Sequence, residues 1–362
     1  MSVAILGDNE QAWLVAAHGS ASSGQVVGLI DAGFPRERIT LDVRYADREA
    51  VATIELAPEL RDADACVIIA ASELDTQRAT TLAALASLAG RIVVLAPGGA
   101  GGAVRTAALL AEASIPGTSL AELTGFPILG AIAGRAVKVS VIKRLLPIGV
   151  LDVADTRKVT DAVLPYLPDL VPAAGVLATS LANTNNVVHP PLATVNASRI
   201  DAGLPFRFYR EGLTSAGSHL IEAVDSERLG LTDALGLERV SIEEWFRRFY
   251  GDQGLVGDDI GSMLGTFGPL DQSSGPSSVA HRYLTDDVGS GLAVFEAVGL
   301  RLGVRMPVTS AICDIVSTLV GQDLRAGTAD TASALLEQGP ISSNPSNVQA
   351  GALASAGIRE GS

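Results

Sequence analysis

The chain has 362 residues, of which 48% are hydrophobic and 4% aromatic, and it contains 38 glycines. This composition predicts a well-packed α/β protein of about two domains. The net charge of −14 argues against a polyanionic partner, because non-specific nucleic-acid binding depends on Lys and Arg neutralising phosphates. We therefore expect no nucleic-acid partner.

Cysteine usage and hydropathy restrict the compartment. Cys66 and Cys313 lie far apart in apolar segments, which fits neither a disulfide framework nor a zinc site, so we expect a reducing environment and no metal. The chain enters an apolar segment at residue 3 without a basic region before it. No stretch reaches about 18 uninterrupted apolar residues. These features predict a cytoplasmic protein without a signal peptide or a membrane span.

The amino-terminal segment has the layout of a dinucleotide-binding βαβ unit. An apolar strand over 3–7 leads into a helix, small residues over 19–24 break that helix, and a second strand over 25–31 ends in Asp31. In such units glycines let the backbone approach the pyrophosphate, and the acid accepts a hydrogen bond from the ribose. We predict a Rossmann-type domain over residues 1–172.

The glycine fingerprint of this unit is altered. Where G-x-G-x-x-G/A is expected, the chain has Gly7-Asp8-Asn9-Glu10-Gln11-Ala12, so Asn9 replaces a glycine or the loop is shortened. The acids beside Asn9 would repel a pyrophosphate, or they stabilise a helix end that has no phosphate beside it. Asp31 is explained equally well as an ordinary strand-end acid. The candidate cofactor residues here are Gly7, Asn9, Ala12 and Asp31.

Two further strands carry possible ligand contacts. A glycine-rich loop that includes Gly98 follows an apolar strand, at the end where open α/β sheets bind ligands, although a plain strand-to-helix connection is an equal alternative. A strand over 136–147 has Lys138, Lys143 and Arg144 at its edges. These cations either face a ligand or lie at a solvated strand end, and we favour the solvated end.

Helical patterns dominate after a proline-rich segment, which marks the expected hinge. We predict a mainly α-helical domain over 173–340 and an irregular tail over 341–362. In an amphipathic helix over 220–235, Asp225 falls on the polar face, whereas Arg228 falls near the apolar face and is expected in an internal ion pair. Ser241, followed three residues later by a glutamate, predicts the start of another helix. Its aromatic residues are expected in the core or on a subunit surface, in preference to a stacking platform for a ring.

The middle of the chain concentrates amide side chains around a histidine, in a sequence with only 4 histidines. Asn183, Asn185 and Asn186 precede His189, and a pair of prolines follows it. On residue types alone we favour a structural histidine at a helix end, held by a backbone carbonyl. The alternative is that His189 transfers protons.

This stretch reads N-x-N-x-x-x-H-P followed by N-A-x-x-I, and it resembles the opine dehydrogenase family, which comprises octopine and nopaline dehydrogenases and their bacterial relatives. The resemblance covers about residues 173–325. It includes Pro205-Phe-Arg-Phe-Tyr209-Arg-Glu211-Gly212, and a second segment similar to H-R-Y-x-x-E-D-V-x-x-G-L in which Asp286 replaces the glutamate. The loop at Gly98 is similar to the family's N-P-G-x-x-G-G, with Ala96 replacing the asparagine.

The resemblance implies that His189 is the catalytic acid/base and that Asp287 is its partner. A carboxylate that accepts a hydrogen bond from one imidazole nitrogen fixes the tautomer and leaves the other nitrogen free for proton transfer. Helix capping is the other interpretation of Asp286 and Asp287. Arg282 either binds substrate or braces Asp287. The candidates for binding substrate carboxylates are Asn183, Asn185 and Arg282.

The implied activity is the reductive condensation of an amino acid amine with a 2-oxo acid, with NAD or NADP as cofactor. We expect these small molecules as partners and a homodimer that works in amino acid metabolism. The alternative is a protein of the same fold that has lost nicotinamide binding and acts as a ligand-binding protein or a non-redox catalyst. Asn9 motivates the alternative, whereas His189 with Asp287 motivates the enzyme.

Overall fold

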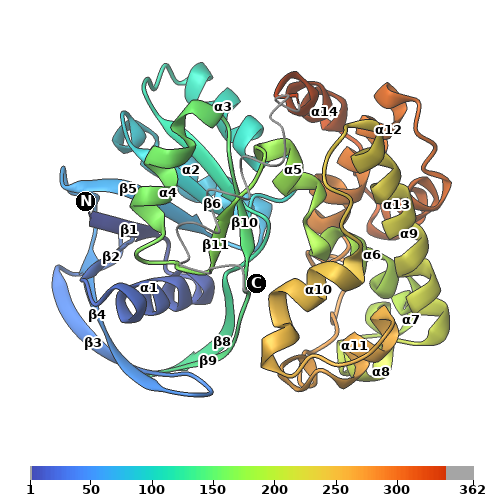
Figure 1. The fold of residues 1–362 in the computed structure, drawn as a ribbon, viewed down its shortest axis with the longest axis horizontal. Helices are drawn as coiled ribbons and strands as arrows, with labels where there is room; N and C mark the ends of the chain where they lie inside the picture. Colours follow the sequence, from blue (N-terminus) through green and yellow to red (C-terminus); the bar gives the residue numbers. More distant parts are fainter. Residues whose placement is uncertain (1, 340–362) are drawn as a thin grey trace, which may run out of the picture.

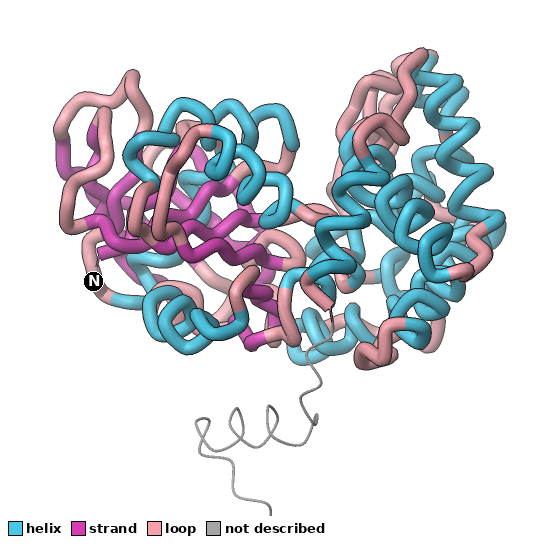
Figure 2. The backbone as a smooth tube through the Cα atoms, turned by 90° about the horizontal axis from the view of Figure 1, so that it is seen from above, coloured by secondary structure: helices cyan, strands magenta, loops and turns pink. Residues whose placement is uncertain are grey.

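The computed structural model describes residues 2–339, and it places a sheet-containing part beside a helical part (Figure 1). Figure 2 shows the same two parts from above, with the strands confined to one of them. The predicted tail over 341–362 lies outside the described residues. The strands are β1 (Ser2–Leu6), β2 (Val27–Ile30), β3 (Glu37–Arg44), β4 (Glu49–Ala57), β5 (Asp64–Ala70), β6 (Ile92–Ala96), β7 (Ser119–Leu123), β8 (Ile128–Ala133), β9 (Ala136–Ile142), β10 (Leu146–Val150) and β11 (Leu170–Pro172).

The helices alternate with the strands in the first part and follow one another in the second. They are α1 (Glu10–Ser23), α2 (Leu74–Ala84), α3 (Gly102–Glu112), α4 (Thr156–Val163), α5 (Val176–Leu181), α6 (Thr184–Val195), α7 (Ala197–Asp201), α8 (Phe208–Gly212), α9 (Ser215–Ala234), α10 (Ile242–Tyr250), α11 (Ile260–Thr266), α12 (Ala293–Leu302), α13 (Pro307–Val320) and α14 (Thr328–Glu337).

The strands form a single sheet in the order β11-β10-β7-β6-β5-β1-β2-β4-β3-β9-β8. β1 pairs in parallel with both β2 and β5. The chain therefore leaves the centre of the sheet on one side, at β2, and returns on the other side, at β5. Open sheets bind ligands where the strand order reverses, beyond the carboxyl ends of the strands. The predicted fold class, a Rossmann-type part followed by an α-helical part, is confirmed.

Side chains of the central strands alternate between two cores, as the period of a strand requires. Val3 and Ile5 lie in the core that includes α1, whereas Ala4 and Leu6 lie in the core that includes Leu110 of α3. Figure 1 shows α1 and α3 on opposite sides of these strands. This double covering explains why β1 is apolar from Val3 to Leu6.

The helix break predicted over 19–24 is wrong, because α1 continues through these small residues to Ser23. Hydroxyl groups there bond within the structure: Ser20 Oγ donates to the carbonyl of Gln25 at 2.7 Å. The helix ends only at Gly24, whose φ of 67° is a left-handed conformation that glycine adopts without strain. The second strand is correspondingly shorter than predicted, spanning Val27–Ile30.

The single strand predicted over 136–147 is two strands, β9 and β10, separated near Leu145, which has a positive φ of 50°. The prediction for its cations is only partly correct. Lys138 is exposed, but Lys143 is only 5% exposed. β9 lies inside the sheet between β3 and β8, so the residues after it enter the protein instead of solvent.

The proline-rich segment is packed and not an open linker. Tyr166 and Leu167 are buried, and β11 pairs in parallel with β10 at the edge of the sheet. The three residues 173–175 then connect β11 to α5. Hydrogen bonds also join the two parts, among them one from the backbone N–H of Gly101 to Ser180 Oγ at 2.9 Å. The loops at the carboxyl ends of the strands are thereby held against the helical part.

A buried ion pair supports the helical part. The expected internal partner of Arg228 is present, because its Nη2 lies 2.7 Å from Asp225 Oδ1. Asp225 was assigned to the polar face of the helix, and that assignment is wrong, since its side chain is buried. It also accepts a hydrogen bond from the backbone N–H of Ile242, the first residue of α10. A helical wheel cannot show that a neighbouring helix end lies over this face.

Candidate active site

His189 lies in the middle of α6, where the sequence predicted a helix end. Asn183 caps the helix, and its side-chain oxygen accepts a hydrogen bond from the backbone N–H of Asn185 at 3.0 Å. The helix continues through Pro190 and Pro191, although each proline removes one backbone hydrogen bond. Its residues from Asn186 to Ala193 are all buried. Packing on all sides therefore outweighs the two lost hydrogen bonds and holds His189 rigidly.

Both ring nitrogens of His189 contact side chains, and neither has the backbone-carbonyl partner that a structural histidine was expected to have. Nδ1 lies 2.7 Å from Asp287 Oδ2, and Nε2 lies 2.9 Å from the hydroxyl of Tyr209. The ring also stacks on Tyr283 with 3.8 Å between centroids. With Nδ1–H donating to the carboxylate, Nε2 is the acceptor for the Tyr209 hydroxyl.

The charges around this pair favour a neutral imidazole beside an ionised carboxylate. Burial lowers the pKa of His189 below its ordinary value of 6.5, against the opposing influence of Asp287. Burial acts to raise the pKa of Asp287, but the hydrogen bond from His189 and the charge of Arg282 outweigh it and hold that pKa below its ordinary value. Arg282 Nη1 lies 3.6 Å from Asp287 Oδ1, so the guanidinium braces the carboxylate.

Asp286 has a different role from its neighbour. Its Oδ2 accepts a hydrogen bond from the backbone N–H of Leu74, the first residue of α2, at 3.0 Å. The interpretation of these acids as caps of the helix that follows them is wrong, because Asp286 bonds instead to the start of a helix 212 residues away in the sequence. This bond joins the helical part to the loop after β5.

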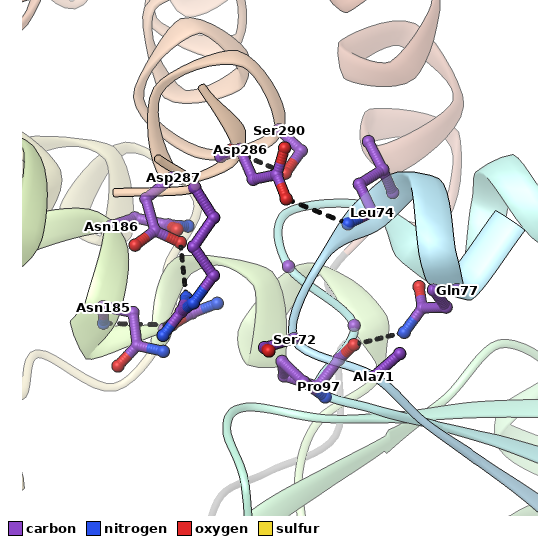
Figure 3. A pocket seen from close by; sticks show the side chains of 14 residues that line it. Ala71, Ser72, Leu74, Gln77, Pro97, Asn185, Asn186, Asp286, Asp287 and Ser290 are labelled. Atoms are coloured by element: carbon purple, nitrogen blue, oxygen red, sulfur yellow. Dashed lines mark hydrogen bonds and ion pairs between the residues drawn. The ribbon is translucent and has the colours of Figure 1, made fainter. Parts of the chain in front are cut away.

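A pocket that is open to solvent lies between the two parts of the molecule. One wall comes from the loops after β5 and β6, including Gly98, and the other comes from the residues around Asn183 and Asp287. Figure 3 shows Ala71, Ser72 and Pro97 from the sheet facing Asn185 and Asp287 from the helical part. The structure thus brings together the following predicted site residues: Gly98, Asn183, Asn185, Arg282 and Asp287.

The loop at Gly98 has no room for a side chain. A Cβ at this position would lie 2.5 Å from the Cβ of Glu122. The buried carboxylate of Glu122 accepts hydrogen bonds from the backbone N–H of Ala103 and from the hydroxyls of Thr179 and Ser180. Burial raises the pKa of Glu122. Glycine is needed here because this anchored carboxylate passes directly under the loop.

The other predicted cofactor residues lie at the ends of β1 and β2 and do not line the pocket. Gly7 has a φ of 111°, which favours glycine. Asn9 is the N-cap of α1, and its side chain accepts from the backbone N–H of Ala12 at 3.0 Å. Asp31 accepts from the backbone N–H of Gly33 at 2.8 Å. Asn9 therefore satisfies a backbone donor at the start of α1, the kind of helix end at which phosphates bind.

Three residues near His189 were not predicted as site residues. Tyr209 and Tyr283 stood inside the two segments that carried the family resemblance, so that signal was available without a role attached. Lys143 is buried, and its charge, with that of Arg282, lowers the pKa of His189. Its sequence neighbourhood gave no sign of burial. Among residues 2–339, no group of three or more His, Cys, Asp or Glu is arranged to hold a metal ion.

Comparison with known proteins identifies the helical part. Residues 172–320 match the family model for the α-helical domain of NAD/NADP octopine/nopaline dehydrogenase. The chain is 29% identical over 275 residues to an opine dehydrogenase from Arthrobacter sp. (strain 1C), covering 75% of each protein. The domain match begins at the end of β11, where the sheet ends and the helices follow.

Solved structures show the same fold. Octopine dehydrogenase in complex with NADH and agmatine superimposes with a TM-score of 0.69 at 17% identity, covering 94% of this chain and 96% of that one. Yersinopine dehydrogenase with NADP⁺ bound gives a TM-score of 0.65 at 16% identity, over 93% and 98% of the two chains. The resemblance expected from the sequence is confirmed: residues 172–320 match the octopine/nopaline dehydrogenase α-helical domain, and the chain is similar to opine dehydrogenases in sequence and in fold.

Proposed function

We propose that this protein is an opine dehydrogenase that joins the amine of an amino acid to the carbonyl carbon of a 2-oxo acid at the expense of NAD(P)H. The observation that carries the proposal is His189, which is held between Asp287 and Tyr209 beside a pocket whose other wall is the Gly98 loop. The family relationship and the names of its relatives support the same activity. Reduced cofactor should be oxidised only when both substrates are present.

The proposed reaction balances as follows. The amine nitrogen attacks the carbonyl carbon of the 2-oxo acid, and loss of water gives an imine. Hydride adds to the imine carbon and a proton to its nitrogen, which leaves a secondary amine. One NAD(P)H and one proton are consumed for each water released. The bound cofactor supplies the hydride, and the protein must manage the protons and the two carboxylates.

His189 is suited to moving these protons. Because burial keeps its pKa low, the neutral ring can take a proton from the ammonium form of the amino acid, and the free amine is the form that attacks. Asp287 stabilises the resulting imidazolium and holds its orientation. The same proton can then pass to the departing hydroxyl oxygen. In the free protein the Tyr209 hydroxyl is the hydrogen-bond partner of Nε2. During the reaction, the reacting oxygen or nitrogen of the substrate replaces this hydroxyl.

The pocket wall has features that suit a nicotinamide dinucleotide. The side-chain nitrogen of Asn186 is buried and has no hydrogen-bond partner within residues 2–339, although it lies at the pocket. An acceptor on a bound ligand would satisfy this donor, and leaving such a group unpaired is costly. The Gly98 loop would lie against the nicotinamide end, and the ends of β1 and β2 against the adenosine end.

Loss of nicotinamide binding, the alternative function, is not favoured. Its motivation was Asn9 with the two neighbouring acids. Asp8 and Glu10 are both exposed, so solvent can screen their charges. Relatives of the same fold bind NADH or NADP⁺, and the His189–Asp287 pair has the geometry that proton transfer needs.

NADH is the expected cofactor in preference to NADPH. Asp31 would accept from the ribose 2′-hydroxyl and repel a 2′-phosphate. Arg36 and Arg38, the nearby cations that could reverse this preference, already pair with Glu59 at 2.5 Å and Glu55 at 3.4 Å. Asp31→Ala should lower the ratio of kcat/KM for NADH to that for NADPH by about tenfold, a loss of about 1.4 kcal/mol. An unchanged ratio would remove Asp31 from the cofactor site.

We also propose a cytoplasmic homodimer that works in amino acid metabolism. Cys66 and Cys313 are both buried free thiols, which suits a reducing compartment. Within residues 2–339, every helix is too short or too polar to cross a membrane. Leu300 of α12 and Ile315 and Leu319 of α13 are exposed on neighbouring helices, and such residues can form a subunit interface. Light scattering from the purified protein measures its mass in solution.

A further inference from the structure

Lys143 is a buried cation between the sheet and the helical part. It follows β9, and its backbone N–H donates to the carbonyl of Pro127 at 2.8 Å. Its side chain is 5% exposed, and Nζ lies 5.4 Å from the ring centroid of Phe249 in α10. A Cβ on Gly125 would lie 2.6 Å from Nζ. The ammonium group therefore occupies a fixed position between the loop after β7 and α10.

Nothing in the described part of the chain neutralises this ammonium. Within residues 2–339, Nζ makes no hydrogen bond and no ion pair, and the ring of Phe249 is its one cation–π neighbour. Burial, and secondarily the charge of Arg282, lower the pKa of Lys143 to about 8. Buried ammonium groups are normally paired, since desolvation without a partner is costly. A buried lysine without an internal partner thus points to a ligand that supplies the counter-charge.

The charges around His189 are consistent with a ligand that neutralises Lys143. Arg282 and Lys143 both act on His189. Asp287 lies close to Arg282, and Asp286 caps α2. Of the two cations, Lys143 alone lacks a carboxylate partner among the described residues. The proposed reaction brings two carboxylates to this place, because the 2-oxo acid carries one on its carbonyl carbon and the amino acid carries one on the carbon bonded to the attacking nitrogen. One cation for each carboxylate is the simplest arrangement.

We propose that the Lys143 ammonium binds the carboxylate of one of the two substrates, while Arg282 is left for the other. This inference rests on the proposed function, which is what brings two carboxylates to His189. It explains why the cation has no internal partner, and it predicts that binding of one substrate depends on Lys143.

The test compares Lys143→Met with Lys138→Met, a matched change at an exposed lysine of β9. Calorimetric titrations of the full chain, saturated with NADH, use pyruvate, the standard L-amino acids and agmatine, which is L-arginine without its carboxylate. We expect the Kd of one class of carboxylate to rise about 10- to 100-fold in Lys143→Met, the loss of one charge-assisted hydrogen bond. Lys138→Met should bind like the wild type.

The titrations also identify which carboxylate is bound. Weaker pyruvate binding assigns Lys143 to the 2-oxo acid. Weaker amino acid binding, with L-arginine affected and agmatine not, assigns it to the amino acid. The melting temperature of Lys143→Met should equal or exceed that of the wild type, because the change removes an unpaired buried charge. If that variant melts early, Lys143→Gln, which keeps a polar side chain, replaces it in the titrations.

The inference is overturned if no carboxylate binds more weakly to the Lys143 variants than to Lys138→Met, and equally if the wild type binds none. Failure of the proposed function looks different, because these titrations require no hydride transfer. A protein that binds carboxylates through Lys143 but never oxidises NADH would refute the proposed activity, while the carboxylate site at Lys143 would still be supported. Normal KM values for both substrates in Lys143→Met would refute the carboxylate site at Lys143, while the dehydrogenase activity would still be supported.

Discussion

Replacing His189 by alanine is expected to lower kcat by about 10²- to 10⁴-fold, the usual contribution of a positioned acid/base. Asp287→Asn should cost a similar factor, because it removes the carboxylate that orients the ring and stabilises the imidazolium. The double variant should lose little more than the worse single variant, since residues that act as one unit are non-additive. The measurement is kcat per folded active site for the three variants, with their melting temperatures.

The pH profile provides a second readout of the same pair. The pKa of His189 lies below 6.5 in the folded protein, and the neutral ring is the form that accepts a proton from the substrate. A histidine ring is neutral above its pKa. Ionisation of His189 should therefore leave kcat/KM unchanged from pH 6.5 upwards, and kcat/KM should fall as the pH drops further. A His189→Ala variant that melts early yet turns over normally would show that the histidine is only structural.

Asp225→Asn is expected to cost about 3–5 kcal/mol of stability, the usual effect of breaking a buried ion pair. Burial raises the pKa of Asp225 even beside Arg228, so the pair itself is not a large source of stability. The cost comes from leaving the Arg228 guanidinium buried without a counter-charge. Urea unfolding, followed by circular dichroism, measures the change in the free energy of unfolding.

Asp233→Asn is the matched control, because it removes a carboxylate from the same helix. Asp233 pairs with Arg239 at 2.6 Å, but their side chains are 56% and 54% exposed. An exposed pair is worth about 0–1 kcal/mol, so this variant should unfold almost like the wild type. Equal losses in the two variants would contradict the role assigned to burial.

Local signals in the sequence were sufficient for the fold class and for some boundaries. The switch from strand to helix periodicity predicted an α/β part followed by helices. Ser241 caps α10 as predicted, accepting from the backbone N–H of Glu244 at 3.3 Å. The aromatic residues of that helix are buried, as expected. In these cases the residues that decide the outcome are neighbours in the chain.

Other features depend on contacts that no local pattern contains. Pro190 and Pro191 predict a helix end, but packing around α6 keeps the helix intact. Asp225 has the spacing of an exposed residue and is buried by the start of α10. Lys143 resembles a solvated strand end, because the sequence does not show that the helical part covers it.

The candidate site also combines residues that the sequence indicated with contacts that it could not show. Residues 98 positions apart, His189 and Asp287, form a hydrogen bond, and only the resemblance to a family placed them together beforehand. Tyr209 and Tyr283 lay inside the recognised segments, but their contacts with the imidazole depend on how α8 and the turn before Val288 pack on α6. Spacing along the chain cannot supply these distances.

The central claim is reductive condensation, and the most direct test is NADH oxidation in the presence of one amino acid and one 2-oxo acid. Deuterium placed at the transferable position of the nicotinamide follows the hydride into the product, which mass spectrometry detects. We predict that NADH is consumed only when both substrates are present and that a secondary amine forms with one deuterium on the carbon that was the carbonyl. NADH that binds but is not consumed with any such pair, or oxidation that needs the 2-oxo acid alone, would contradict the claim.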